Sequence, residues 1–189
     1  SDSLFQSVIK ESENDASEKS FASMVVFKNK GQNRLVNVRA ISSNYPLVGD
    51  ITDKEGDSKR INKEQGFVSI NQSLAIQYGL KLGDSLQIGN SSFQISAFHS
   101  KAPGQSGIAA TVAPTVFISL NDLDSTGLVR IGSRIQRSYY FKMKDEKTAN
   151  MAFNNFEKLG IDEGLRIENI ETGRERLGRT YKNLFRFLN

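Results

Sequence analysis

Apolar and polar residues alternate in short, well-punctuated runs through the middle of the chain, at residues 66–98. The apolar run at 67–70 predicts a strand, and Asn71 is placed to cap a short helix that ends at Gly79. Two alternating runs follow, separated by Gly89-Asn90, which is a hairpin signal. This stretch therefore predicts a strand, a short helix and a β-hairpin. It contains no nucleophilic, metal-binding or phosphate-binding spacing.

The first part of the chain predicts one helix and two strands. Apolar residues at 4–9 follow a helical spacing that fades into a polar run at 11–19. Residues 21–27 and 36–40 then carry strand-forming residues on either side of a polar turn. They predict a hairpin with one buried face.

The last part of the chain predicts a strand, a helix, a second short strand and a final helix. Strict alternation at 135–143 is the clearest strand pattern in the sequence. Asp145 can cap the helix that follows, and Gly160 can end it. A short strand at 165–167 precedes a capping box at 172–175, which predicts the start of the final helix.

These elements predict an α+β fold in two parts. Residues 1–47 and 135–189 supply helices and strands that look like two halves of one layer. Residues 48–134 consist mainly of short strands and turns. We therefore expect a discontinuous α/β subdomain with an inserted β-rich subdomain.

Composition indicates an ordinary globular chain. Of its 189 residues, 38% are hydrophobic and 24% are charged, and the formal net charge is +4. The chain contains no cysteine, which excludes disulfides, thiol catalysis and cysteine–zinc sites. The longest weakly polar stretch, at 108–120, contains Pro114 and is too short to span a bilayer. By composition we expect this chain to be soluble.

Possible catalytic residues lie near one loop, at 99–107. His99 is the single histidine of the chain, and Ser106 lies in Gly104-Gln-Ser-Gly107, one residue short of a nucleophile elbow. A soluble serine hydrolase that uses Ser106 and His99 is one hypothesis. A structural role for His99 is the alternative, because a catalytic imidazole needs an orienting partner.

Basic residues suggest a different hypothesis, a nucleic-acid-binding module. Arg130, Arg134 and Arg137 lie around one predicted strand, and five basic residues lie on the final helix. However, acidic residues are interspersed in the second group, and no aromatic stacking platform accompanies the first. A solvated face explains both groups, so we expect no nucleic-acid partner.

The sequence predicts neither a metal site nor a cofactor. Asp122 and Asp124 share a short turn, but helix capping explains them and the EF-hand ligand pattern is missing. No Walker motif and no Gly-x-Gly-x-x-Gly sequence occurs.

Through the order and spacing of a set of short motifs, the sequence resembles the extracytoplasmic domain of FtsX/MacB-like ABC transporter permeases, and most closely their YbbP-like branch. The resemblance spans roughly residues 20–188. The motifs are Val36-Asn-Val-Arg-Ala-Ile41, Tyr45-Pro-Leu-Val-Gly49, Val68-Ser-Ile-Asn-Gln-Ser-Leu-Ala75, Gly79-Leu-Lys-Leu-Gly-Asp84, Ile88-Gly89, Ala113-Pro-Thr-Val-Phe-Ile118, Asp122-Leu123, Thr126-Gly-Leu-Val129 and Gly132-Ser-Arg134.

The resemblance implies a porter-like α/β subdomain, made by both ends of the chain, that carries the β-rich insertion. It implies a non-catalytic domain of a permease in the inner (plasma) membrane, exposed on the extracytoplasmic side. ATP would be hydrolysed by a separate ATP-binding subunit, the partner of the full-length permease. A periplasmic protein, a lipoprotein or a lipid would be the further partner or cargo.

The same resemblance implies where this domain would act. The apolar stripe on Leu184, Phe185 and Leu188 would lead into a transmembrane helix beyond the end of this chain. Two surfaces are candidates for contact with a partner or cargo, namely the turn at 45–49 and the loop at 99–107. Their candidate residues are Tyr45, Pro46, Leu47, His99, Lys101 and Pro103. In the alternative interpretation, Tyr45 and Pro46 shape a junction between subdomains and the loop is merely exposed.

Overall fold

The computed structural model describes residue 10, residues 12–47, residue 51, residues 63–100, residues 112–158 and residue 168. The chain divides into two compact units. One unit comprises residues 15–140. The other comprises residues 1–14 and 141–189.

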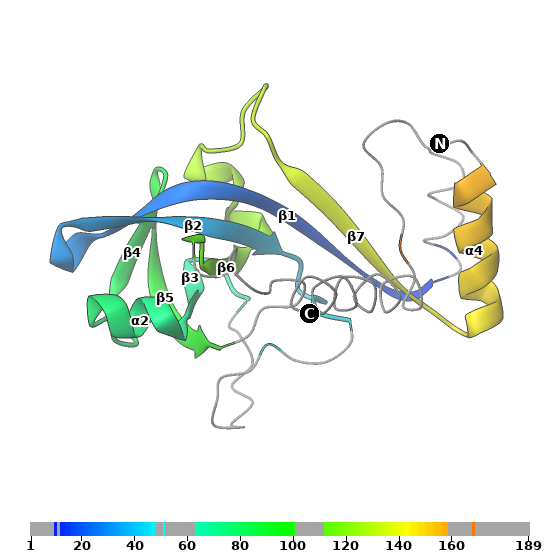
Figure 1. The fold of residues 1–189 in the computed structure, drawn as a ribbon, viewed down its shortest axis with the longest axis horizontal. Helices are drawn as coiled ribbons and strands as arrows, with labels where there is room; N and C mark the ends of the chain where they lie inside the picture. Colours follow the sequence, from blue (N-terminus) through cyan, green and yellow to red (C-terminus); the bar gives the residue numbers. More distant parts are fainter. Residues whose placement is uncertain are drawn as a thin grey trace, which may run out of the picture. The chain divides into compact units, whose positions relative to one another are not determined.

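A single seven-stranded sheet contains all the strands of the described residues (Figure 1). The strands are β1 (Ser12–Phe27), β2 (Gln32–Ile41), β3 (Phe67–Asn71), β4 (Ser85–Ile88), β5 (Ser91–His99), β6 (Thr115–Ser119) and β7 (Gln136–Met143). The helices are α2 (Gln72–Tyr78), α4 (Glu146–Lys158) and the 3-10 helices η1 (Lys28–Lys30), η2 (Leu120–Asp122) and η3 (Asp124–Thr126).

Six of these strands form a closed ring. The strand order is β2-β6-β3-β5-β4-β1-β7, and β1 pairs with β2 as well as with β4, so the first six strands close on themselves. The β2–β6 and β3–β5 pairs are parallel, and the other described pairs are antiparallel. Closure leaves the strands of this barrel without an open edge.

Alternate residues of each strand point into the barrel and form its core. Val25 and Phe27 of β1, Val36 and Val38 of β2, and Phe93 of β5 are all buried. Helix α2 adds Leu74 to this core, and the ring of its Tyr78 lies 4.6 Å from the ring of Phe27. This apolar core supplies the main hydrophobic stabilisation of the unit.

Local signals placed several elements correctly. The side-chain Oδ1 of Asn71 accepts a hydrogen bond from the Ser73 backbone at 2.9 Å, and Gly79 ends α2 in the left-handed conformation. Asp145 caps α4 in the same way, through a 2.7 Å hydrogen bond from the Thr148 backbone. Gly89 is required at the β4–β5 turn, because a Cβ atom there would lie 2.1 Å from the Thr126 carbonyl oxygen.

The N-terminal strand is longer than the sequence predicts. We expected a strand from residue 21, after a polar run at 11–19, but β1 already begins at Ser12. Ala16 and Glu18 are buried at alternate positions within that polar run, and Glu18 pairs across to Ile41 of β2. Cross-strand pairing therefore overrides the polar composition of the segment.

Other predicted elements fall outside the described residues. They are the helix at 4–9, the strand at 165–167 and the final helix from 172 onward. The predicted subdomain bounds, 1–47 with 135–189 and 48–134, stay a prediction. The compact units have different bounds, and β2 and β6 are paired although the predicted bounds would separate them.

Within the described part of the chain, no helix is both long enough and apolar enough to cross a lipid bilayer.

Candidate functional site

A buried hydrogen-bonded network lies on the outer face of the barrel, where β1, β2 and β7 come together. Its centre is an ion pair between Glu18 of β1 and Arg39 of β2, which are 5% and 6% exposed. Arg39 Nε donates to Glu18 Oε1 at 2.7 Å, and Arg39 Nη2 donates to Glu18 Oε2 at 2.5 Å. This bidentate geometry fixes both side chains in one arrangement.

Two tyrosines complete the network. Arg39 Nη2 also donates to the hydroxyl of Tyr45, in the turn after β2, at 2.6 Å. The hydroxyl of Tyr140, on β7, donates to Glu18 Oε2 at 3.0 Å. Residues that are far apart in the sequence, on three strands and one turn, thus share one set of hydrogen bonds.

Apolar side chains enclose this network and form a second, smaller core. Arg39 lies over two aromatic rings, with its guanidinium carbon 5.5 Å from the centre of Tyr45 and 5.1 Å from that of Phe117. The second core consists of Ala16, Ile41, Tyr45, Ile51 and Phe117, with Leu47 and Tyr140 packed against it. Stacking on rings and a bidentate carboxylate are interactions that arginine makes and lysine does not reproduce.

The network keeps its protons at neutral pH. Burial by itself would lower the pKa of Arg39, but the hydrogen bond and the charge of Glu18 outweigh burial and raise it. Burial raises the pKa of Tyr45 and of Tyr140. Arg39 therefore stays charged, and both phenols stay protonated and able to donate hydrogen bonds.

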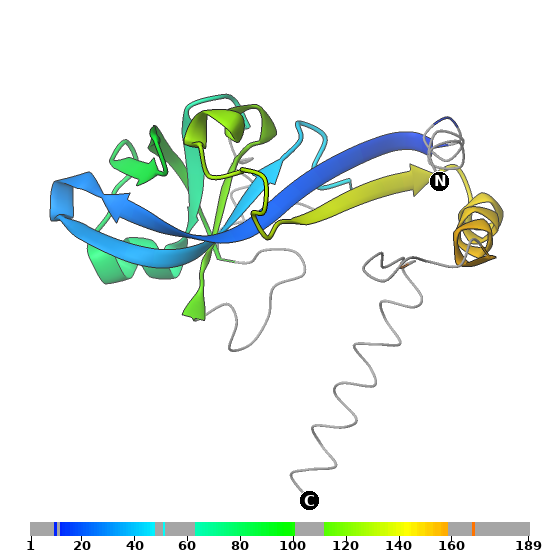
Figure 2. The ribbon, with the colours of Figure 1, turned by 90° about the horizontal axis from the view of Figure 1, so that it is seen from above.

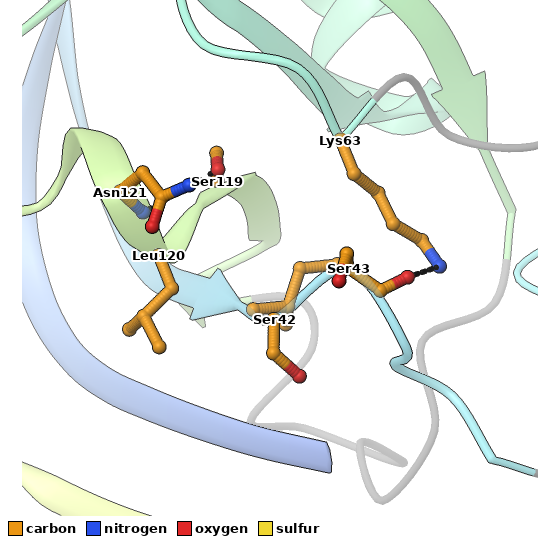
Figure 3. Close-up of a pocket in the computed structure, with 7 residues that line it drawn as sticks. Ser42, Ser43, Lys63, Ser119, Leu120 and Asn121 are labelled. Carbon is orange, nitrogen blue, oxygen red and sulfur yellow. Dashed lines mark hydrogen bonds between the residues drawn. The ribbon is translucent and has the colours of Figure 1, made fainter.

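A small polar cavity of about 160 Å³ lies next to this network, at the carboxyl ends of the parallel strands β2 and β6 (Figure 3). Lys63 reaches across it, and its Nζ donates a hydrogen bond to the Ser43 carbonyl oxygen at 2.7 Å. The lining residues are Ile41, Ser42, Ser43, Lys63, Ser119, Leu120 and Asn121. The cavity can accommodate a small polar group or several water molecules.

His99 lies inside the protein and not on a surface loop. Its side chain is fully buried, its Nδ1 lies 2.9 Å from Ser69 Oγ, and its ring packs edge-on against Phe117 at 4.9 Å. Burial and the nearby charge of Arg39 lower the pKa of His99 to about 3, although the Thr115 backbone acts in the opposite direction. A neutral, enclosed imidazole supports the structural interpretation of His99. It also corrects the hydrolase hypothesis, since a buried ring cannot reach a substrate, and Ser106 lies outside the described residues.

The predicted contact turn is only partly at the surface. Tyr45 is 3% exposed and belongs to the second core, which corrects the expectation that its side chain meets a partner. Pro46 and Leu47 are half-buried and follow a cis peptide bond. Lys101 and Pro103, and the predicted membrane link at Leu184, Phe185 and Leu188, lie outside the described residues.

Sequence reasoning missed three members of the network, Glu18, Arg39 and Tyr140. Arg39 carried one usable signal, because it is a charged residue inside the alternating strand pattern Val36-Asn-Val-Arg-Ala. Glu18 is one of several charges in a polar run, and nothing distinguishes Tyr140 from its neighbour Tyr139. Among the described residues, no group of histidine, cysteine, aspartate or glutamate side chains is arranged to hold a metal ion.

Comparison with known proteins identifies the class of protein. Residues 2–159 match the family described as MacB-like periplasmic core domain, and the chain belongs to this family. This finding confirms the resemblance seen in the sequence. It makes the chain a periplasmic domain of the kind found in ABC transporter permeases, which is not a known class of enzyme.

A relative recognised by its sequence supports the assignment. The chain is 30% identical over 109 residues to the uncharacterized ABC transporter permease YbbP of Escherichia coli (strain K12). That match covers 57% of this chain and 13% of the relative, so the chain corresponds to a small part of that protein.

Two solved structures share the fold. The periplasmic region of MacB from Actinobacillus actinomycetemcomitans superposes with a TM-score of 0.56 at 15% identity, covering 93% of this chain and 81% of that one. The extracellular domain of the noncanonic ABC-type transporter YknZ from Gram-positive bacteria gives a TM-score of 0.54 at 12% identity and covers 88% of each chain. The α+β fold class is thereby confirmed.

Proposed function

We propose that this chain is the extracytoplasmic domain of an ABC transporter permease, and that it couples a docked partner or cargo to transmembrane helices. A separate ATP-binding subunit drives those helices in the full-length permease. The permease resides in the inner membrane. The family assignment supports this proposal, together with the way in which the strands connect the two compact units.

The continuity of β1 and β7 is the observation that carries the coupling. Both strands cross from one unit into the other, since the division falls after Asn14 in β1 and after Tyr140 in β7. The two strands are neighbours in the sheet (Figure 2). In the unit that contains residues 1–14 and 141–189, Lys142 Nζ lies 3.8 Å from Glu13 Oε2 across the pair. The chain therefore passes between the two units twice, each time within a strand.

We propose that a periplasmic protein, a lipoprotein or a lipid docks near the turn that contains Pro46 and Leu47. The half-buried side chains of this turn lie on the same segment as Ser42 and Ser43 of the polar cavity. Lys101 and Pro103 belong to the same proposal on sequence grounds. Leu184, Phe185 and Leu188 would make the link to a transmembrane helix.

Hydrogen exchange in the reconstituted full-length permease tests the coupling. With its ATPase present, addition of ATP should change the exchange of amides in β1 and β7 relative to the nucleotide-free state. An ATPase variant that binds ATP without hydrolysing it serves as the control. If exchange in β1 and β7 is the same in every nucleotide state, the domain does not follow the ATPase cycle and the proposal is wrong.

A photo-crosslinking group at Leu47 tests the docking surface. It should capture a specific envelope component in cells. The same group at Gln94, an exposed position on β5, should not capture that component. Equal capture from both positions would contradict the assignment of this surface.

A further inference from the structure

Tyr140 is the residue of β7 that reaches the buried ion pair. Its hydroxyl donates to Glu18 Oε2, an oxygen that also accepts from Arg39 Nη2. Arg39 in turn donates to Tyr45 in the turn after β2. A continuous path of side-chain hydrogen bonds therefore runs from β7 through β1 and β2 to the turn that precedes Pro46 and Leu47.

This path depends on one register of β7 against β1. Side chains alternate between the two faces of a strand, so a slip of one residue would turn Tyr140 to the other face. A slip in the direction that brings Phe141 to the network would leave no hydroxyl there, because phenylalanine has none. Glu18 Oε2 would lose a donor in a site that is almost closed to water, and an unpaired buried acceptor is unfavourable. The network therefore discriminates between an engaged and a disengaged position of β7.

The chemistry of the network favours a positional role over a purely stabilising one. A buried ion pair generally contributes less to stability than well-packed apolar side chains of the same volume, because both charges lose their hydration. The main core beside it is a cluster of buried aliphatic and aromatic side chains and shows what packing alone provides. Directional hydrogen bonds and a bidentate pair, by contrast, specify one geometry.

We propose that Glu18, Arg39, Tyr45 and Tyr140 form a latch that fixes β7 in one register and passes its displacement through β2 to the turn at 44–47. This inference rests on the proposed coupling function, since it names the side chains that would carry the motion. The displacement would pass along the hydrogen bonds in their order, from β7 to the turn. Displacement of β7 moves the Glu18 carboxylate, the carboxylate moves Arg39, and Arg39 moves the hydroxyl of Tyr45.

The test uses hydrogen exchange in the full-length permease, reconstituted with its ATPase, with and without ATP. Tyr140→Phe removes the hydrogen bond to Glu18 and keeps the aromatic ring. Tyr78→Phe is the control, because it deletes the same atom from a tyrosine on α2, outside the network. In the nucleotide-free state, Tyr140→Phe should raise the exchange rate of the β7 amides at 136–140 about tenfold, the effect of losing one hydrogen bond to a charged group. Tyr78→Phe should leave that rate within about twofold.

The response to ATP distinguishes this inference from the proposed function. In the parent permease, β7 and the peptide that covers residues 41–47 should respond together. In Tyr140→Phe, β7 should still respond while the response at 41–47 is lost. If both segments respond in Tyr140→Phe as in the parent, the latch is overturned and coupling stands. If neither segment responds in the parent, the proposed function itself is wrong.

A second variant, Tyr45→Phe, interrupts the path at its other end and leaves Tyr140 in place. Here β7 should exchange and respond as in the parent, while the response at 41–47 falls at least threefold. An undiminished response at 41–47 in this variant would also overturn the latch.

Discussion

The barrel interior and the network on its outer face are both buried, but they are built on opposite principles. The interior is filled by aliphatic and aromatic side chains that alternate along each strand. The network places two charges and two phenols in an enclosure of rings and aliphatic groups. The barrel interior stabilises the fold through apolar volume and burial. The network fixes the positions of its side chains through directional hydrogen bonds.

The largest expected effect comes from the barrel interior. Phe93→Ala should lower the free energy of unfolding by about 4 kcal/mol, because it removes a buried ring and leaves a cavity. Urea denaturation followed by circular dichroism measures this change. Phe93→Leu keeps most of the apolar volume. Its free energy of unfolding should fall by less than about half of the decrease expected for Phe93→Ala. Equal losses for the two variants would mean that shape, and not apolar volume, dominates this core.

In the network, replacing one member of the ion pair should cost more stability than replacing both members. Arg39→Met should lower the free energy of unfolding by about 3 kcal/mol, because it leaves the Glu18 carboxylate buried without its cation. The double variant Glu18→Leu/Arg39→Met should recover most of this loss in the same denaturation experiment. A double variant as unstable as Arg39→Met alone would show that the ion pair itself supplies net stability.

His99 provides an intermediate effect that can be measured by pH alone. The folded protein holds the pKa of this ring near 3, below its ordinary value of 6.5, so the folded state disfavours the charged form. The free energy of unfolding is therefore highest above pH 6.5, where the ring is neutral in both states. It decreases as the pH falls from 6.5 toward 3. Between pH 8 and pH 5 the free energy of unfolding should fall by about 2 kcal/mol.

The control for this pH dependence is His99→Gln. His99 is the single histidine of the chain, so the variant should lose most of the change between pH 8 and pH 5. Parallel pH profiles for the variant and the parent protein would assign the dependence to other groups.

The smallest effect concerns a local cap. Asn71→Ala removes the side-chain acceptor for the Ser73 backbone N–H at the start of α2 and should lower the free energy of unfolding by about 1 kcal/mol. Thermal unfolding is sensitive enough to detect this change. Asn71→Asp keeps an acceptor and should be nearly neutral. A loss of 1 kcal/mol in that variant as well would assign the effect to packing rather than to the cap.

Local chemistry made the strands, the short helix and its caps predictable. Asn71, Gly79 and Asp145 act through neighbours within five residues, so their roles can be inferred from the sequence around them. Closure of the barrel could not be inferred in this way. It depends on the pairing of β2 with β6 and of β1 with β4, whose partners are distant in the sequence.

The candidate site was predictable only in part, and for the same reason. The sequence predicts the turn at Tyr45 as a contact surface, but the side chain of Tyr45 is buried. Its burial depends on Arg39, Phe117 and Tyr140, which reach it from three different strands. A charged residue inside an alternating strand was the one clue, and it gives no indication of which partner will neutralise it.

The order of the strands around the ring also determines how long each strand waits for its partner during synthesis. β2 ends at Ile41, but its parallel neighbour β6 begins only at Thr115, 74 residues later (115 − 41). At a synthesis rate of about 5–20 residues per second, that neighbour arrives roughly 4–15 s after β2 has been made. During this interval the outer backbone groups of β2 have no native strand to pair with. A chaperone that acts on this protein would find its substrate in that interval.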